Sequence, residues 1–150
     1  MKKEKKAILV PLTNSKSSEA VIEYLLDISL CPEDWDITLL HLFRRPSESE
    51  ELMGKKFTKE QPIRMMKILE KARDRLIERG YPPNNIKIEL LDEGYPTVAD
   101  GLIDQYNKRK FDMIVISRKS MSKAEEFIRG DIGVKLVRAL EKAAVLVVKS

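Results

Sequence analysis

Short apolar segments alternate along this chain with longer segments in which apolar residues recur at helical spacing. The short segments have the length of strands, and the first is closed by Pro11. Short, bounded apolar runs of this kind are typical of strands that are buried on both faces of a sheet. The longer segments predict amphipathic helices. The expected strands cover residues 6–12, 37–43, 86–90, 111–117 and 144–150, and the expected helices cover 13–30, 63–80, 95–110 and 130–143.

The first two expected helices have recognisable starts, ends and buried faces. Ser17 or Ser18 is expected to cap the first helix, because a serine hydroxyl can accept a free backbone N–H there. Gly80 is placed to end the second helix, which follows Pro62. The residues expected to face the core are Val21, Leu25 and Ile28 in the first helix, and Ile63, Met66, Leu69, Leu76 and Ile77 in the second.

Strands that alternate with helices imply an α/β fold with a parallel sheet and right-handed crossovers. The chain has 150 residues, the size of one ordinary domain, and it contains no repeat, low-complexity tract or linker. We therefore expect residues 1–150 to form a single domain. Residues 44–60 are polar without a clear period, and their conformation cannot be predicted beyond a surface segment.

Composition narrows the class of protein. The apolar fraction of 43% and charged fraction of 35% are typical of a soluble globular protein, and no apolar run is long enough to span a membrane. Much of the formal charge of +4 comes from Lys2, Lys3, Lys5 and Lys6. The other basic residues are interspersed with acidic ones, without the concentrated basic face of a nucleic-acid-binding protein. The single cysteine, Cys31, excludes an internal disulfide and favours a cytoplasmic location.

The residues with catalytic potential do not form a recognisable catalytic group. His41, the one histidine, lies inside an apolar strand, where a packed and hydrogen-bonded role is expected. No cysteine or histidine cluster has metal-ligand spacing. Ser15, Ser17 and Ser18 do not resemble a nucleophile elbow. We therefore predict no catalytic residue, no metal site and no enzymatic activity.

Three stretches together resemble the universal stress protein family over essentially the whole chain. The first is KAILVPLTNSKSSEAVIEYLLDIS, which resembles the opening strand, turn and helix of that family. The second is GYPTVADGLIDQYNKRKFDMIVISR, with Gly94, Pro96 and Asp112 in the family's positions, and the third is GDIGVKLVRALEKAAVLVVK. The resemblance implies a five-stranded parallel sheet of order 3-2-1-4-5 with helices on both faces, the Rossmann-like sandwich of the adenine-nucleotide alpha-hydrolases. It also implies a small cytoplasmic stress-response protein, usually dimeric, with no catalytic chemistry shared by all members.

ATP-binding members of the family carry Gly-x2-Gly-x9-Gly-Ser/Thr after the fourth strand. Here the four positions fall on Ser117, Ser120, Gly130 and Asp131. The spacing is kept, but only one of the three glycines is present. Glycine lets backbone N–H groups approach a phosphate without a Cβ in the way, so the two serines are expected to weaken binding. Arg118, Lys119, Lys123 and Arg129 flank this loop and could offset part of the effect, or could pair with Glu125 and Glu126.

Asp131 is the more damaging change, because it stands where the last helix is expected to begin. Its carboxylate could accept the free N–H groups that would otherwise hold a phosphate. Two like charges about 4 Å apart also repel by about 4 kcal/mol at an intermediate dielectric constant. On the resemblance, the nucleotide-contacting residues would be Pro11, Leu12, Thr13, Ser117, Arg118, Ser120, Gly130 and Asp131, with Thr13 where ATP-binding relatives have an aspartate. We expect no cofactor, with ATP binding weak or absent.

The last strand raises the question of partners. In the family's sheet order it forms an edge, and an exposed apolar edge favours pairing with another strand. The resemblance implies an antiparallel pair across a two-fold axis, so a homodimer is expected to form through Val145, Leu146, Val147 and Val148. The function expected is a non-enzymatic dimer that engages other, unidentified proteins, with neither a nucleic acid nor a membrane as partner. The alternatives are an ATP-binding signalling module whose dimer or partner surface responds to nucleotide and, less favoured, a nucleotide hydrolase.

Overall fold

The computed structural model describes residues 4–28, 31–43, 60–92, 94–119, 123–124 and 131–150. Within them, five strands form one sheet in the order β3-β2-β1-β4-β5, and every neighbouring pair is parallel. The predicted α/β class and the strand order 3-2-1-4-5 are therefore confirmed. The strands are β1 (Lys6–Pro11), β2 (Trp35–Leu42), β3 (Ile86–Leu91), β4 (Met113–Arg118) and β5 (Ala144–Lys149).

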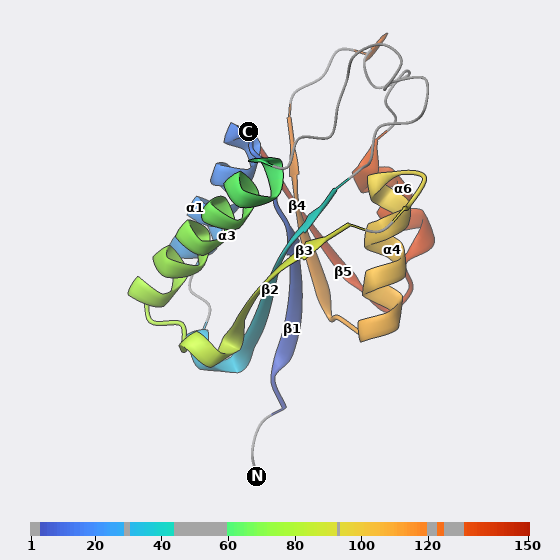
Figure 1. Cartoon of the computed structure of the whole chain (residues 1–150). Helices are drawn as coiled ribbons and strands as arrows, with labels where there is room; N and C mark the ends of the chain where they lie inside the picture. Colours follow the sequence, from blue (N-terminus) through green and yellow to red (C-terminus); the bar gives the residue numbers. More distant parts are fainter. Residues whose placement is uncertain (1–3, 29–30, 44–59, 93, 120–122, 125–130) are drawn as a thin grey trace.

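The longer helices cover both faces of this sheet. Figure 1 shows α1 and α3 on one face and α4 and α6 on the other. This arrangement is that of a doubly wound sheet, in which parallel strands are buried on both sides. The helices are α1 (Lys16–Asp27), α3 (Glu60–Glu78), α4 (Val98–Arg109) and α6 (Ile132–Ala139), with two single 3-10 turns, η1 (Pro32–Asp34) and η2 (Pro83–Asn85).

The core consists of two apolar layers separated by the sheet. Strand β1 lies at the centre, and its residues alternate between the layers because successive side chains of a strand point to opposite faces. Ile8 and Val10 pack in the layer beneath α1 and α3, whereas Leu9 packs in the layer beneath α4 and α6. All three are fully buried. The continuous apolar run in the sequence thus reflects a strand covered on both faces.

The start of α1 differs from the prediction. Ser15, not Ser17 or Ser18, is the N-cap, and its hydroxyl accepts the backbone N–H of Ser18. Ser18 lies inside the helix and is buried. Its hydroxyl accepts the backbone N–H of Thr13 at 2.8 Å and so fixes the turn between β1 and α1. Several neighbouring serines could each cap a helix, and the direction in which the chain leaves β1 selects Ser15.

The buried face of α3 also differs in part from the prediction. Leu69 and Leu76 are fully buried as expected, but Ile63 is 61% exposed, and Met65 is buried in place of Met66. The buried stripe contains Ala72, which is too small to stand out as a core residue in the sequence. A shift of one residue turns a side chain by about 100° around a helix, so the broad apolar face left this choice open.

Candidate functional site

Strands β1 and β4 are parallel neighbours, so their carboxyl ends lie at the same end of the sheet. The helices that follow them along the chain lie on opposite faces. The described ladder between these two strands covers Ile8 with Met113 and Leu9 with Ile114. The turn after β1 leads to α1 on one face, whereas α6 lies on the opposite face (Figure 1). In open α/β sheets, ligands bind outside the carboxyl ends of the strands at such a switch point. The predicted nucleotide residues lie at the carboxyl ends of these two strands and in the segments that follow them.

Asp131 caps the N-terminus of α6. Its carboxylate accepts the backbone N–H of Gly133 at 2.9 Å and that of Val134 at 3.4 Å. The guanidinium group of Arg118, at the end of β4, lies 2.8 Å from the other carboxylate oxygen. The Asp131 side chain is only 17% exposed, so little of its charge is available to water. The expectation that this carboxylate takes the free N–H groups of the last helix is confirmed.

This geometry opposes phosphate binding in two ways. The N–H groups at the start of a helix are the donors that would hold an anion, and here Asp131 already accepts them. Arg118, the cation expected to favour a phosphate, is paired with the same carboxylate. A phosphate could use these donors only by displacing a covalently attached anion that is already in place.

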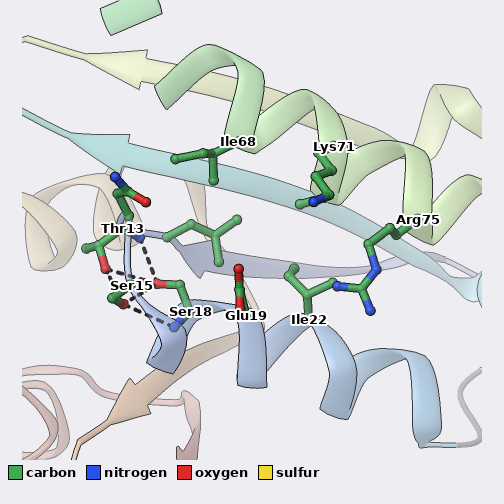
Figure 2. A pocket seen from close by; sticks show the side chains of 11 residues that line it. Thr13, Ser15, Ser18, Glu19, Ile22, Ile68, Lys71 and Arg75 are labelled. Carbon is green, nitrogen blue, oxygen red and sulfur yellow. Dashed lines mark hydrogen bonds between the residues drawn. The ribbon is translucent and has the colours of Figure 1, made fainter. Parts of the chain in front are cut away.

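The turn after β1 is closed by a group of three hydroxyls. The Thr13 Oγ1 atom lies 2.8 Å from Ser15 Oγ and 3.0 Å from Ser18 Oγ, and the two serine oxygens are 3.4 Å apart. The Thr13 hydroxyl is therefore hydrogen-bonded within the turn, as the dashed lines in Figure 2 show. Thr13 also lacks the carboxylate of the aspartate that ATP-binding relatives have at this position.

Two separate hollows divide the predicted nucleotide residues between them. Leu12 and Thr13 line a cavity of about 140 Å³ between α1 and α3. Ser117, Arg118 and Asp131 line a hollow of about 540 Å³ between α6 and the ends of β4 and β5. Pro11 lines neither, and Ser120 and Gly130 lie outside the described residues, as do Glu125, Glu126 and Arg129. Among the described residues, the predicted site is not brought into one pocket.

His41 occupies the packed position that the sequence predicts. Its Nδ1–H donates to the carbonyl oxygen of Leu12 at 2.7 Å, and its ring packs edge-on against Phe43 at 4.7 Å between centroids. Burial lowers the pKa of His41 below its ordinary value, and the bond to Leu12 opposes this only in part. His41 is thus neutral at physiological pH and fixes the turn after β1.

A second polar cluster, around Tyr95, was not predicted. The Tyr95 hydroxyl donates to Asp104 at 2.6 Å and accepts from the amide of Gln105 at 3.1 Å. The hydrogen bond from Tyr95 to Asp104, together with that from Lys108, lowers the pKa of the Asp104 carboxyl. The cluster fixes the turn before α4 to the helix itself. Its signal in the sequence, three polar residues on one helical face after a tyrosine, is too common to have been recognised.

The described part of the chain contains no group of three or more His, Cys, Asp and Glu side chains that could hold a metal ion. None of its helices combines the length and the apolar character needed to cross a membrane.

Comparison with known proteins identifies the family. The model of the universal stress protein family matches residues 5–149. The chain therefore belongs to the universal stress protein family. No curated protein matches its sequence.

Solved structures support the same fold. UspA from Lactobacillus plantarum, a universal stress protein, is 17% identical, with a TM-score of 0.69 over 97% of this chain and 98% of that one. A universal stress protein in complex with cAMP is 17% identical, with a TM-score of 0.64 over 95% of each chain. The Archaeoglobus fulgidus universal stress protein in complex with dAMP is 15% identical, with a TM-score of 0.62 over 99% of this chain and 98% of that one.

Proposed function

We propose that this universal stress protein is a non-enzymatic homodimer of the cytoplasm that acts through contacts with other proteins, and that its binding of ATP is weak or lost. The observation that carries the proposal is the Asp131 carboxylate, which caps α6 and pairs with Arg118. Asp131 thereby binds the backbone N–H donors at the start of α6 and the cation of Arg118, which a nucleotide phosphate would need. The function must then reside on the surface of the protein and not in an occupied nucleotide cleft.

The electrostatics of Asp131 favour loss of affinity for a triphosphate. A phosphate oxygen about 4 Å from this carboxylate would meet a repulsion of about 4 kcal/mol at an intermediate effective dielectric constant. Because 1.4 kcal/mol corresponds to a tenfold change in affinity, this repulsion is large enough to remove a micromolar site. If Arg118 turned away from Asp131 to meet the phosphate, the carboxylate would lose its partner.

The edge of the sheet supports the homodimer. Strand β5 pairs with β4 on one side, and none of the described residues pairs with its other side. Val147 on this strand is 37% exposed. Three further exposed apolar residues, Ile132, Val134 and Val137, lie on α6 beside the hollow that Val147 also lines. An apolar strand edge that continues into an apolar helix face is a surface that a second copy can cover.

The absence of an enzymatic role is part of the proposal. The one histidine of the chain has its Nδ1 atom bonded to a backbone carbonyl and its ring packed against Phe43. It is held in place by the fold, and among the described residues its side chain is hydrogen-bonded to Leu12 and to no serine hydroxyl. A general base for hydrolysis would have to come from another group.

A second candidate, a nucleotide-responsive signalling module, is favoured by one observation. Two of the universal stress proteins that share this fold were solved in complex with cAMP and dAMP. Both ligands carry a single phosphate and so would meet less repulsion from Asp131 than ATP. In this alternative the nucleotide would alter the dimer or a partner surface.

Analytical ultracentrifugation of the purified chain with and without millimolar Mg-ATP tests the proposal. We expect the mass of a dimer in both conditions, because neither the β5 edge nor α6 would respond to a ligand that does not bind. A monomer without ATP would contradict the homodimer. A change of mass on addition of Mg-ATP would support the signalling module instead.

A further inference from the structure

The cavity between α1 and α3 has an apolar floor and a charged mouth. Leu12 and Ile22 are buried at its base, and Ile68 and Ala72 from α3 complete the apolar wall. Its volume is about 140 Å³. A buried apolar cavity of about 150 Å³ is large enough to take up benzene, so this one has room for a compact apolar group of that size. A nucleotide is far larger.

Three charged side chains face one another across the mouth. Figure 2 shows Lys71 and Arg75 reaching from α3 toward α1, and Glu19 rising from α1 toward them. Within the described part of the chain, none of the three forms an ion pair or a hydrogen bond. Two cations and one carboxylate leave one positive charge at the mouth. A ligand with one negative charge would balance it, whereas a phosphate dianion would exceed it.

The hydroxyls of Thr13 and Ser15 line the end of the cavity nearest the carboxyl end of β1. Both residues are exposed, and their oxygens are 2.8 Å apart. Both hydroxyls are hydrogen-bonded within the turn, and they make this end of the cavity polar. The cavity is therefore amphipathic along its length, with hydroxyls at one end and cations beside the apolar wall.

We propose that this cavity binds a small monocarboxylate with a compact apolar body, such as an aromatic ring or a branched alkyl group. The apolar body lies against Ile22 and Ile68, and the carboxylate lies between Lys71 and Arg75. Arginine suits this role because its planar guanidinium group matches a carboxylate with two parallel hydrogen bonds. This site lies on the face of α1 and α3, away from Asp131, and of the predicted nucleotide residues only Leu12 and Thr13 line it.

Benzoate is the probe, and benzamide, which has the same shape without the charge, is its control. We would titrate each into the isotopically labelled protein near neutral pH and 0.15 M salt and follow the backbone amide signals by NMR. A ligand of this size is expected to bind with a Kd on the order of 1 mM. Benzoate should shift the signals of Thr13, Ile22 and Ala72 in a saturable manner, and benzamide should bind at least tenfold more weakly.

Three variants assign the binding to this cavity. Lys71→Gln combined with Arg75→Gln should weaken benzoate binding at least tenfold, and Ile68→Trp, which fills the cavity and keeps the charges, should abolish it. Lys87→Gln removes an exposed lysine from β3 and should leave binding unchanged. Equal binding of benzoate and benzamide would overturn the proposal. So would a double variant within twofold of the wild type, or signal shifts confined to other parts of the chain.

Discussion

The carboxylate of Asp131 lies 2.8 Å from the guanidinium group of Arg118, and it accepts the backbone N–H of Gly133 at the same time. One side chain thus joins the end of β4 to the start of α6. The bond to Gly133 satisfies a donor that a helix start otherwise leaves free, and the ion pair neutralises the cation nearest to it. Structural stabilisation and loss of an anion site therefore follow from the same residue.

Replacement of Asp131 should show its stabilising role. Asp131→Ala removes the cap and is expected to lower the free energy of unfolding by about 1 kcal/mol. Asp131→Asn should lose less, because asparagine is also a good N-cap and keeps the bond to Gly133. Urea unfolding followed by circular dichroism measures both. Equal losses for alanine and asparagine would show that the charge on Asp131, and not the cap, is what matters.

Gly101 is expected to be required by packing and not by backbone conformation. A Cβ atom there would lie 2.8 Å from Leu42 Cδ1 and 2.9 Å from Tyr95 Cδ2. Both distances are shorter than those at which non-bonded carbon atoms pack in proteins. Alanine is the better helix former by up to about 1 kcal/mol, but forcing it into this contact costs about 1–3 kcal/mol. Gly101→Ala should therefore unfold at a lower urea concentration.

The control for Gly101 is an exposed position on the same helix. Asn107→Ala adds helix propensity without a close neighbour, since Asn107 is exposed, and should leave stability unchanged or slightly higher. If Gly101→Ala stabilised the protein as Asn107→Ala does, the close packing of α4 against Leu42 and Tyr95 would be refuted.

His41 should make stability depend on pH. Burial lowers its pKa in the folded protein below the unfolded value of 6.5, so below that pH the unfolded chain binds the proton more readily. The contribution of neutral His41 is complete above pH 6.5 and is lost as the pH falls through the folded pKa. We expect the urea midpoint of the wild type to fall more steeply than that of His41→Gln as the pH is lowered below 6.5. Parallel pH profiles would contradict this role.

The proposed dimer should be sensitive to charge on β5. Val147→Lys places a cation on the exposed apolar edge and should shift the protein toward monomer in sedimentation velocity experiments. Ile63→Lys is the matched control, because Ile63 is more exposed than Val147 but lies on α3, which packs against β2 and β3 at the other side of the sheet. An unchanged dimer for Val147→Lys would place the interface elsewhere.

Much of the fold follows from periodicity alone. The strands at residues 37–43 and 144–150 were predicted to within two residues at each end, because apolar runs of strand length are bounded there by polar residues and turns. The order 3-2-1-4-5 came from the family resemblance, since alternation of strands and helices does not define the order of strands in a sheet. The choice between Ser15, Ser17 and Ser18 as N-cap depended on the path of the chain after β1.

The candidate site was predicted less completely than the fold. The role of Asp131 could be predicted because it depends on one residue at one helix end. The cavity of Ile22, Ile68, Lys71 and Arg75 could not, because it forms only when two helices far apart in sequence pack side by side. Residues that share a site across a helix interface carry no spacing signal in a single sequence.

Calorimetric titration with Mg-ATP, after the protein has been stripped by unfolding and refolding, tests the central claim most directly. The wild type should show no saturable heat up to millimolar ATP near physiological salt. The variant with Asp131→Ser, Ser117→Gly and Ser120→Gly should bind ATP at least tenfold more tightly, because it restores the donors and removes the repelling carboxylate. Micromolar binding by the wild type would contradict the account, since the phosphate would then have displaced Asp131 from the start of α6.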